Sequence, residues 1–186
     1  MYEDDILVEQ ALGGDDGAVE QLYFKYVDSV FRYAYVHLGD YHDAEELTQT
    51  VFWKSMQGLH KFKRQSSFKT WLFSIAYRAI IDQSRKQKRQ RFLKKRLEDL
   101  ELRMPQRASV DRQVTAKESY DETISLLQQL PEQYRMVLFL RFVEENSLES
   151  TAEVMKRSYK SVQALQYRAQ KKLMDLARKE AEQDEG

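Results

Sequence analysis

The sequence predicts an all-α protein with two small helical modules joined by a charged linker. The chain of 186 residues has only six Gly and two Pro, whereas residues that favour helices, such as Leu, Gln, Glu, Lys, Arg and Ala, are abundant. Apolar residues recur every three or four positions, as on one face of an amphipathic helix. This periodicity weakens in one central stretch, which indicates a boundary between modules.

The first module, residues 1–96, is expected to hold four helices. Their apolar stripes cover about residues 6–12, 16–38, 42–59 and 67–82. Gly13-Gly14 and Gly39-Asp40 separate the first three, because glycine readily ends a helix, and Asp15 or Asp16 can cap the second. Ser67 can cap the fourth helix, whose apolar stripe fades into a basic run over residues 83–96.

Residues 97–118 are predicted to be the linker, residues 119–179 the second module and residues 180–186 an acidic tail. Apolar periodicity returns at Ile124, and Pro131 suits the first position of a further helix. A short helix that starts at Asn146-Ser147 and ends at Met155 precedes a final helix that Ser158 can cap.

This last pair of helices has the pattern of a helix-turn-helix, whose second helix enters the major groove of DNA. Its first residues would reach base edges, since Gln can pair with adenine and Lys can donate to guanine. The candidates for base contact are Ser158, Tyr159, Lys160, Ser161 and Gln163, and those for phosphate contact are Lys156, Arg157, Arg168, Lys171 and Lys172. A helical hairpin with a solvated basic face is the alternative reading of the same residues.

Charges lie in blocks although the net charge is zero. Residues 1–60 carry 3 basic and 12 acidic groups, and residues 61–97 carry 13 and 1. Residues 98–155 carry 6 and 12, and residues 156–179 carry 8 and 1. Two separate basic blocks favour two contacts with a polyanion, and the acidic blocks favour a basic protein partner.

Aromatic and basic residues alternate within the first basic block. Phe62, Phe68, Trp71, Phe73 and Tyr77 lie among Lys61, Lys63, Arg64, Lys69 and Arg78. Rings stack on unpaired bases while cations hold the backbone, so this pattern suits single-stranded nucleic acid. Aromatics at helical spacing are more often core, and we expect Trp71, Leu72 and Ile75 to be mainly core.

The amino-acid composition disfavours several classes of protein. No cysteine is present, which removes disulfides and thiolate metal sites, and the three His do not form a metal-binding pattern. No phosphate-cradling Gly loop is present, so we expect neither an enzyme nor a cofactor or metal. Without an apolar run long enough to span a membrane, or the basic start of a signal peptide, we expect a cytoplasmic protein with no membrane insertion.

Three segments in order resemble bacterial RNA polymerase sigma factors of the extracytoplasmic-function group. Residues 43–52, Asp-Ala-Glu-Glu-Leu-Thr-Gln-Thr-Val-Phe, are similar to the family's Asp-Ala-Glu-Asp-Leu-Thr-Gln-Glu-Val-Phe. Residues 66–72, Ser-Ser-Phe-Lys-Thr-Trp-Leu, are similar to Ser-Ser-Phe-Arg-Thr-Trp-Leu. Residues 130–138, starting Leu-Pro-Glu-Gln-Tyr-Arg, resemble the opening of the family's fourth region. The turn at Lys156 departs from the family, which usually has Gly there.

The resemblance implies a sigma factor that binds core RNA polymerase, through its clamp helices and flap, and recognises the minus-35 and minus-ten promoter elements. It also implies melting of the promoter, so that the protein meets both double- and single-stranded DNA, and regulation by an anti-sigma factor. The implied polymerase-binding residues are Asp43, Glu46, Gln49 and Phe52. The implied minus-ten residues are Lys61, Phe62, Lys63, Arg64, Ser66, Ser67, Phe68, Lys69, Trp71, Arg78, Asp82, Arg85 and Lys86. The final helix pair would read the minus-35 element.

Two other binding functions remain as alternatives. A stand-alone helix-turn-helix transcriptional regulator would explain the second module but not residues 43–52 or the aromatic loop. An RNA-binding or antitermination protein would use the basic run at residues 85–96. Dependence of promoter binding on core polymerase separates both from a sigma factor.

Overall fold

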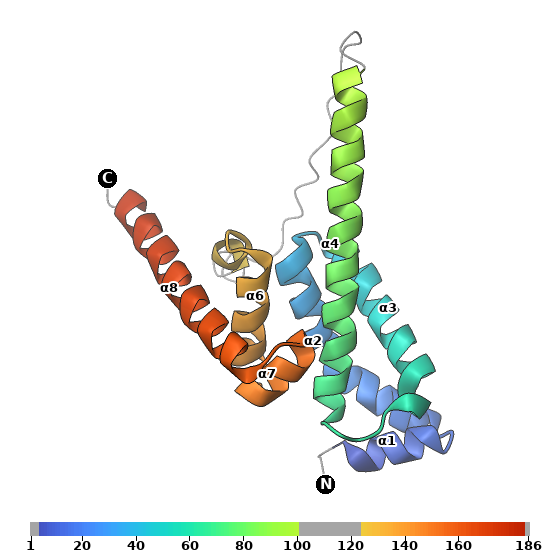
Figure 1. The fold of residues 1–186 in the computed structure, drawn as a ribbon. Coiled ribbons are helices and arrows are strands. Elements are labelled where there is room, and N and C mark those ends of the chain that lie inside the picture. The colour runs from blue at the N-terminus through green and yellow to red at the C-terminus, as the bar shows by residue number, and fades with distance from the viewer. Residues whose placement is uncertain (1–3, 101–123, 185–186) are drawn as a thin grey trace.

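The computed structural model describes residues 4–100 and 124–184, and the predicted all-α fold is confirmed there, with no strand in these two ranges. Residues 124–128 are also helical. The named helices (Figure 1) are α1 (Asp5–Leu12), α2 (Asp16–Leu38), α3 (Tyr41–Gly58), η1 (Leu59–Lys61), α4 (Phe68–Leu100), α6 (Glu132–Leu138), the π-helical turn η2 (Phe139–Val143), α7 (Leu148–Met155) and α8 (Tyr159–Asp184).

The first module packs α2, α3 and α4 around a shared core, with α1 against α2. Polar caps fix where these helices begin. The Asp15 carboxylate accepts from the backbone N–H groups of Gly17 and Ala18 at 2.9 and 3.3 Å, and the Ser67 hydroxyl accepts from the Thr70 N–H at 3.1 Å. Such caps satisfy N–H groups that have no partner inside the helix. The sequence predicted the Ser67 cap and gave Asp15 as one of two candidates for the other.

Helix α2 ends at Gly39, which adopts the left-handed backbone conformation with a φ of 72°. A side chain is strained at this φ, so glycine suits the position. The next helix is then capped by Asp40, whose carboxylate accepts from the Asp43 N–H at 2.9 Å. This turn sets the direction of α3 across α2.

Helix α4 is longer than its apolar stripe. It continues through the basic run to Leu100, beyond residue 96, because Gln, Arg and Lys are good helix formers and no Gly or Pro interrupts them. Its far end extends past the other helices of the first module (Figure 1). The backbone of the basic run is therefore a continuation of α4.

The second module is built from α6, η2, α7 and α8. Ser147 caps α7, and its hydroxyl accepts from the Ser150 N–H at 3.1 Å. Thr151 is fully buried, and its hydroxyl donates to the Ser147 carbonyl at 2.8 Å, which satisfies a polar group inside this helix. Lys156 ends α7 in the left-handed conformation with φ 51° and ψ 49°. The turn expected at Lys156 is confirmed, in a conformation that glycine adopts with less strain.

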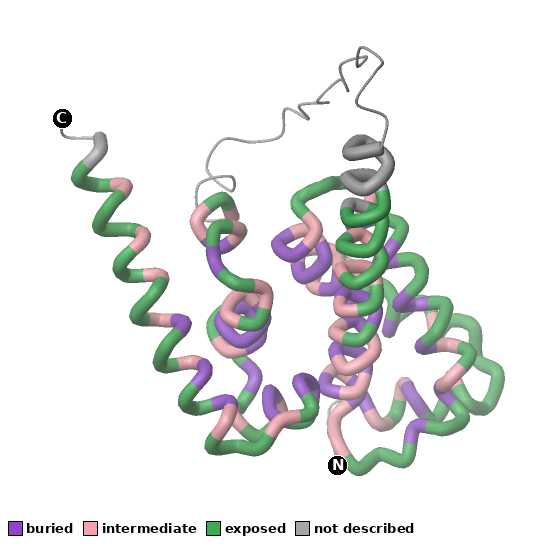
Figure 2. Tube along the Cα trace, turned by 45° about the horizontal axis from the view of Figure 1, so that its top comes forward, coloured by how far each residue is buried: buried purple, intermediate pink, exposed green. Residues whose placement is uncertain are grey.

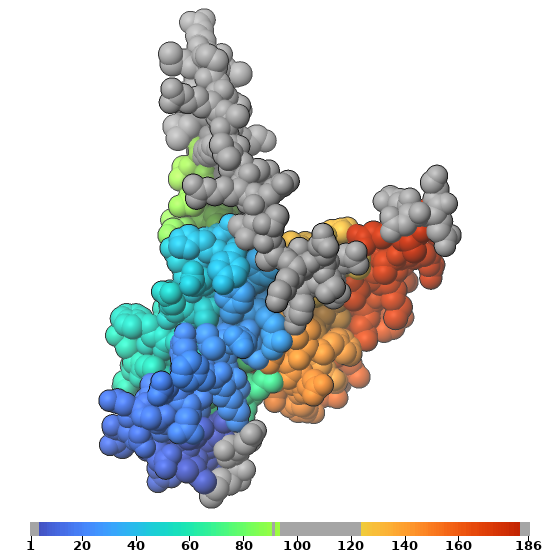
Figure 3. All heavy atoms as spheres, turned by 180° about the vertical axis from the view of Figure 1, so that it is seen from behind, coloured from blue at the N-terminus to red at the C-terminus, as the bar shows by residue number. Residues whose placement is uncertain are grey.

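The two modules pack against each other. Helix α7 lies against α4, and α6 lies against α2. The rings of Tyr33 on α2 and Phe139 on η2 are 5.1 Å apart, and both residues are buried. Buried residues of the two modules form one continuous core in the centre of the molecule, whereas residues 85–90 of α4 and residues 171–182 of α8 are mainly exposed (Figure 2). Seen from behind, the modules abut directly (Figure 3). The sequence predicted both modules but not this contact.

Across the described residues, no helix is both long and apolar enough to cross a membrane.

Candidate nucleic-acid and polymerase interface

The acidic face of α3 presents two of its four predicted polymerase-binding side chains to solvent. Glu46 and Gln49 are exposed, and the Glu46 carboxylate lies 3.5 Å from the His42 ring. Asp43 is half-buried and accepts from the Gln87 side chain at 3.2 Å, which ties α3 to α4. Phe52 is only 5% exposed and packs in the core, and its contact with polymerase stays a prediction.

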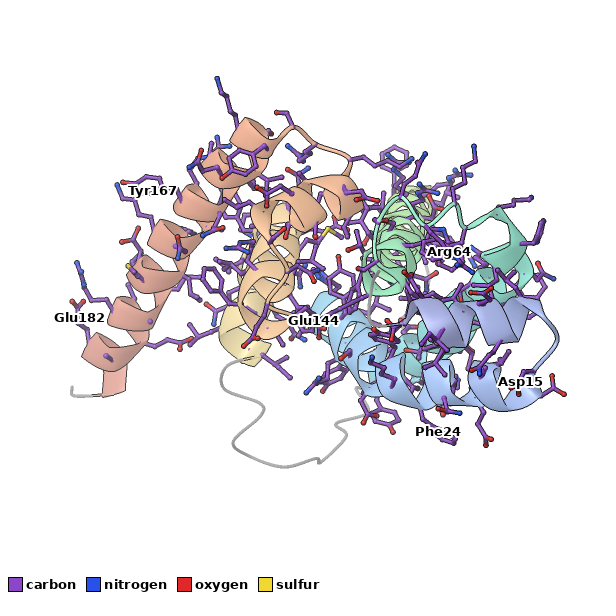
Figure 4. All side chains as sticks on the ribbon, turned by 90° about the horizontal axis from the view of Figure 1, so that it is seen from below. Asp15, Phe24, Arg64, Glu144, Tyr167 and Glu182 are labelled. Atoms are coloured by element: carbon purple, nitrogen blue, oxygen red, sulfur yellow. The ribbon has the colours of Figure 1, made fainter. Side chains whose placement is uncertain are left out.

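An apolar groove that the sequence analysis missed lies beside this face. It has a volume of about 560 Å³ between α2 and α3, and Tyr23, Phe24 and Met56 line it. The ring of Tyr23 contacts both Phe24 and Phe52, at centroid distances of 5.6 and 4.8 Å. Phe24 points away from the body of the protein (Figure 4). Exposed aromatics of this kind mark contact surfaces more often than isolated exposed residues do.

Trp53 adds a further exposed aromatic ring, with 61% of its surface accessible. The sequence contained a signal for Trp53 and Phe24. Both lie outside the apolar stripes of their helices. Residues on that solvent-facing side are normally polar unless they bind a partner.

The loop between η1 and α4 is held by its aromatic residues. The rings of Phe62, Phe68 and Trp71 are in mutual contact, with centroids 5.1–6.1 Å apart. Phe62 and Phe68 are 7% and 1% exposed. Both rings therefore pack inside the protein and support the loop, and the DNA contact of Phe62 and Phe68 stays a prediction. Phe73 is likewise buried.

The polar residues of the same loop are accessible. Lys61, Lys63 and Arg64 are exposed, while Ser66 and Ser67 are half-buried. Arg64 adopts a φ of 54°, and its guanidinium lies 3.6 Å from the Glu9 carboxylate of α1. The loop is therefore basic and accessible. It rests on the packed rings of the aromatic residues, and the contact between Arg64 and Glu9 limits its movement.

A hollow of about 410 Å³ lies between the end of α3 with η1 and the first half of α4. Trp71 and Ile75 give it an apolar wall, and its polar lining includes Lys61, Arg78 and Asp82. An apolar ring surface beside cations fits the chemistry of an unpaired base and its phosphate. Four of the predicted minus-ten residues therefore line one cavity: Lys61, Trp71, Arg78 and Asp82. Arg85 and Lys86 are exposed further along α4.

Lys69 behaves differently from the other predicted minus-ten residues. Its Nζ lies 3.0 Å from the Glu144 carboxylate and donates to the Glu144 carbonyl at 2.7 Å. This side chain therefore contacts the second module and is only partly exposed.

The helix-turn-helix places its predicted base-contact residues on an open surface. Val162, Leu165 and Ala169 of α8 are buried against the module. The side chains of Tyr159, Lys160 and Gln163 are exposed, and Ser161 is half-buried. The Ser158 hydroxyl accepts from the Ser161 N–H at 3.3 Å, so it caps the helix as predicted.

The predicted phosphate contacts are largely free of the core as well. Lys156, Arg168, Lys171 and Lys172 are exposed. Arg157 is half-buried, and its guanidinium donates to Gln133 at 2.8 Å. Tyr167 was not predicted, although it is 69% exposed and projects outward from α8 (Figure 4).

A metal site is not formed by the described residues, since no three His, Asp or Glu side chains gather there in a suitable cluster. The arrangement offers binding surfaces: an acidic face with an apolar groove, a basic hollow and a basic helix.

Known proteins carry the same two parts in the same order. The family model Sigma-70 region 2 matches residues 22–90, and Sigma-70, region 4 matches residues 120–173. The ECF RNA polymerase sigma factor SigX of Bacillus subtilis (strain 168) is 32% identical over 169 residues, which is 88% of this chain and 87% of SigX.

Two solved structures share the fold. The sigma factor RpoE, in complex with the anti-sigma factor NepR from Bartonella quintana, matches with a TM-score of 0.67 and 19% identity, over 86% of this chain and 96% of that one. CnrH in complex with the cytosolic domain of CnrY matches with a TM-score of 0.69 and 21% identity, over 94% of this chain and 96% of that one.

Proposed function

Because the chain belongs to the extracytoplasmic-function (ECF) group of RNA polymerase sigma factors, we propose that it directs core polymerase to promoters through separate surfaces on its two modules. The observation that carries this assignment of surfaces is the basic hollow of Lys61, Trp71 and Arg78 beside the acidic face of α3. Sigma factors are DNA-binding initiation factors, and transcription initiation is the activity in which this chain takes part.

The polymerase surface comprises Asp43, Glu46 and Gln49, extended by the neighbouring apolar groove. Its acidic character supports contact with a basic helical surface such as the clamp helices. Trp53 and Phe24 supply exposed rings of the kind that dominate binding energy at protein interfaces. Phe52 supports the surface from beneath.

The minus-ten surface comprises the loop over residues 61–67 and the following side of α4. Trp71 and Ile75 would receive a base that has left the duplex, while Lys61 and Arg78 hold its phosphates. Arg85 and Lys86 continue the basic track along the helix and would contact the adjacent backbone.

The minus-35 surface is the exposed start of α8. Lys160 and Gln163 are free to contact base edges, and Arg168, Lys171 and Lys172 to contact phosphates. Tyr167 lies on the open side of the same helix and extends this surface. A further contact of the second module with the polymerase flap is part of the proposal.

In this assignment residues 1–96 form the polymerase- and minus-ten-binding domain, and residues 119–179 form the minus-35-binding domain. Residues 97–118 connect them, and residues 180–186 form an acidic tail. Most of the predicted linker lies outside the described residues. The part inside them, up to Leu100, continues α4.

An anti-sigma factor is a further expected partner. RpoE, whose fold this chain shares, was solved with the anti-sigma factor NepR. The exposed apolar groove and the acidic α3 face are the surfaces at which such a protein would compete with polymerase.

Promoter binding with and without core polymerase tests the proposal. A sigma factor should bind a cognate promoter fragment specifically only when core polymerase is present. A stand-alone regulator would bind its site alone, with a footprint that added polymerase leaves unchanged.

A further inference from the structure

Helix α1 meets the minus-ten surface at two places. It packs against η1, whose Lys61 lines the basic hollow, and the Glu9 carboxylate on α1 lies 3.6 Å from the Arg64 guanidinium of the loop. Helix α1 and this loop lie at the same end of the first module (Figure 1). The match to Sigma-70 region 2 begins at residue 22, so α1 precedes it. The helix nevertheless lies where it can act on the predicted DNA-binding loop.

Asp4, the residue before α1, is a buried carboxylate that holds Tyr26 of α2. Asp4 is 3% exposed and Tyr26 is 6% exposed. The Tyr26 hydroxyl donates to one carboxylate oxygen, and the Lys25 ammonium lies 2.6 Å from the other. A buried carboxylate is costly unless it is paired and hydrogen-bonded, and a hydrogen bond to an ionised acceptor is stronger than a neutral one. The bond to Asp4 therefore fixes the position of the Tyr26 ring.

The Tyr26 ring continues into the aromatic residues beneath the loop. Its centroid is 5.7 Å from that of Phe68, and the Phe68 centroid is 5.7 Å from that of Trp71. Tyr26 and Phe68 are buried, whereas Trp71 is half-buried and lines the hollow. Protein interiors are close-packed, so a ring that moves displaces the next one. Three contacts in series therefore connect Asp4 to the ring that we assign to an unpaired base.

The contact between Glu9 and Arg64 acts on the backbone of the loop. Arg64 has a φ of 54°, in the left-handed region, which is unfavourable for a residue with a Cβ atom. Such a conformation persists where the surrounding structure holds it. The side chains of Arg64 and Glu9 are 37% and 74% exposed, and an exposed ion pair contributes little energy. We therefore expect Glu9 to be the weaker anchor of the loop and Asp4 the stronger one.

Base stacking and phosphate binding differ in how precisely they need the hollow to be placed. A base stacks on a ring face at van der Waals distance, so a small shift of Trp71 reduces the contact. Lys61 and Arg78 reach phosphates with long side chains, and the attraction between charges falls only slowly with distance. A displaced Trp71 should therefore weaken the capture of a base and leave phosphate binding nearly unchanged.

We propose that α1 positions the minus-ten hollow for an unpaired base. Asp4 acts on Trp71 through the two rings between them, and Glu9 acts on the loop through Arg64. Asp4 and Glu9 are positioning residues, because neither touches the DNA in this assignment. The inference rests on the proposed function, since it takes the hollow as the place where the base binds. It adds to the minus-ten surface a helix that carries none of the predicted DNA contacts.

Binding of single-stranded minus-ten DNA by the holoenzyme, core polymerase with this protein bound, separates the base from its phosphates. The probe is a fluorescent non-template oligonucleotide from a promoter that the holoenzyme transcribes, with copies that each carry one abasic site. The Kd of an abasic copy divided by that of the intact probe measures what one base contributes. In wild type the largest ratio, which marks the captured base, should be at least about fivefold.

Asp4→Ala and Tyr26→Phe break the same hydrogen bond from opposite sides, and Tyr26→Phe keeps the ring. Each should lower the ratio at the captured base about threefold, while the abasic copy binds within about twofold of wild type. The double variant should lower the ratio no further, because both changes remove one interaction. Val30→Ala, which leaves a cavity in the core on the same helix, controls for a general loss of stability and should keep the wild-type ratio. Titrations are run below the onset of unfolding of every variant.

Glu9→Lys tests the loop contact with a surface change that removes no packing. It places a second cation beside Arg64, which should lower the ratio about twofold. The control is Asp28→Lys, which makes the same change of two charge units at an exposed site on α2 and should keep the wild-type ratio. Added positive charge strengthens phosphate binding to intact and abasic DNA alike, so this effect cancels in the ratio.

A wild-type ratio in both Asp4→Ala and Tyr26→Phe would overturn the role of Asp4, and a wild-type ratio in Glu9→Lys would overturn that of Glu9. An equal fall in Val30→Ala would show that α1 only stabilises the fold. Failure of the proposed function would look different. The wild-type holoenzyme would then lose no affinity at any abasic position, or the protein would not bind core polymerase at all.

Discussion

Phe52 and Trp53 are neighbours on α3 with opposite environments: Phe52 is 5% exposed, and Trp53 is 61% exposed. Successive residues of an α-helix point about 100° apart, so one ring packs on Tyr23 while the next leaves the core. Phe52 therefore contributes to the stability of the first module, whereas Trp53 belongs to the surface proposed to bind polymerase.

Replacing these two rings should therefore have different effects. Trp53→Ala should change the free energy of unfolding by less than about 0.5 kcal/mol and weaken binding to core polymerase by about 1–3 kcal/mol. Phe52→Ala should lower the free energy of unfolding by about 3–4 kcal/mol, because it leaves a cavity. Urea unfolding and a polymerase titration measure the two quantities. Gln57→Ala, at another exposed site on α3, is the control, and wild-type core affinity of Trp53→Ala would contradict the assigned surface.

Lys156→Gly should stabilise the second module. Lys156 adopts a φ of 51° at the end of α7, a conformation that glycine adopts without side-chain strain. We expect the free energy of unfolding to rise by about 0.5–1 kcal/mol in urea titrations. Lys156→Ala removes the same charge but keeps a side chain, so it should give no such gain. Equal effects of the two substitutions would show that the charge, and not the backbone, is responsible.

Lys171→Ala should reduce the salt dependence of promoter binding. A lysine that neutralises one phosphate contributes about 0.9 to the slope of log K against log salt concentration. Holoenzyme titrations with promoter DNA over a potassium chloride series should give a slope shallower by roughly this amount. Lys179→Ala, an exposed lysine of α8 outside the predicted set, is the comparison. A slope unchanged by Lys171→Ala would remove this residue from the phosphate contacts.

His37 should make the fold sensitive to mild acid. Burial, followed by the nearby Arg135 guanidinium, lowers the pKa of His37 from 6.5 to about 3. Tyr33 and Arg135 are the titratable groups beside it, and burial raises the pKa of Tyr33 and lowers that of Arg135. Between pH 3 and 6.5 the unfolded chain holds a proton on this ring that the folded chain lacks, so stability falls as pH drops through 6.5.

The expected loss between pH 7.5 and pH 5 is about 2 kcal/mol from this residue alone. Urea unfolding at both pH values should show it in wild type, and His37→Leu should reduce the loss by that amount. Carboxylates titrate in both proteins, so only the difference between them is assigned to His37. The same reduction in His60→Gln, a change at an exposed histidine, would contradict the assignment.

Local signals predicted the helices and their caps well. Asp15, Ser67 and Ser158 cap helices as expected, because a short polar side chain before an apolar stripe offers an acceptor to free N–H groups. The end of α4 was less predictable, since its basic run is as helix-forming as the segment before it.

Local sequence signals could not predict which residues far apart in the chain pack together. Periodicity indicates that Tyr33 is buried, but it does not say that Phe139 covers it. The aromatic loop shows the same limit, because Phe62 and Trp71 carry similar chemistry and only the fold turns Phe62 inward and leaves Trp71 at a cavity wall. The exposed charges on α8 could be predicted without knowledge of long-range packing. Val162, Leu165 and Ala169 mark the buried face of the helix, so residues on the opposite face are exposed.

Run-off transcription with purified bacterial core polymerase and a genomic promoter library tests whether this protein directs initiation at specific promoters. We expect transcripts that require this protein, that share minus-35 and minus-ten sequences, and that are lost when Lys61 and Arg78 are both replaced by Ala. Core polymerase without the protein is the control. If the protein neither binds core polymerase nor changes transcription, the proposed function is wrong.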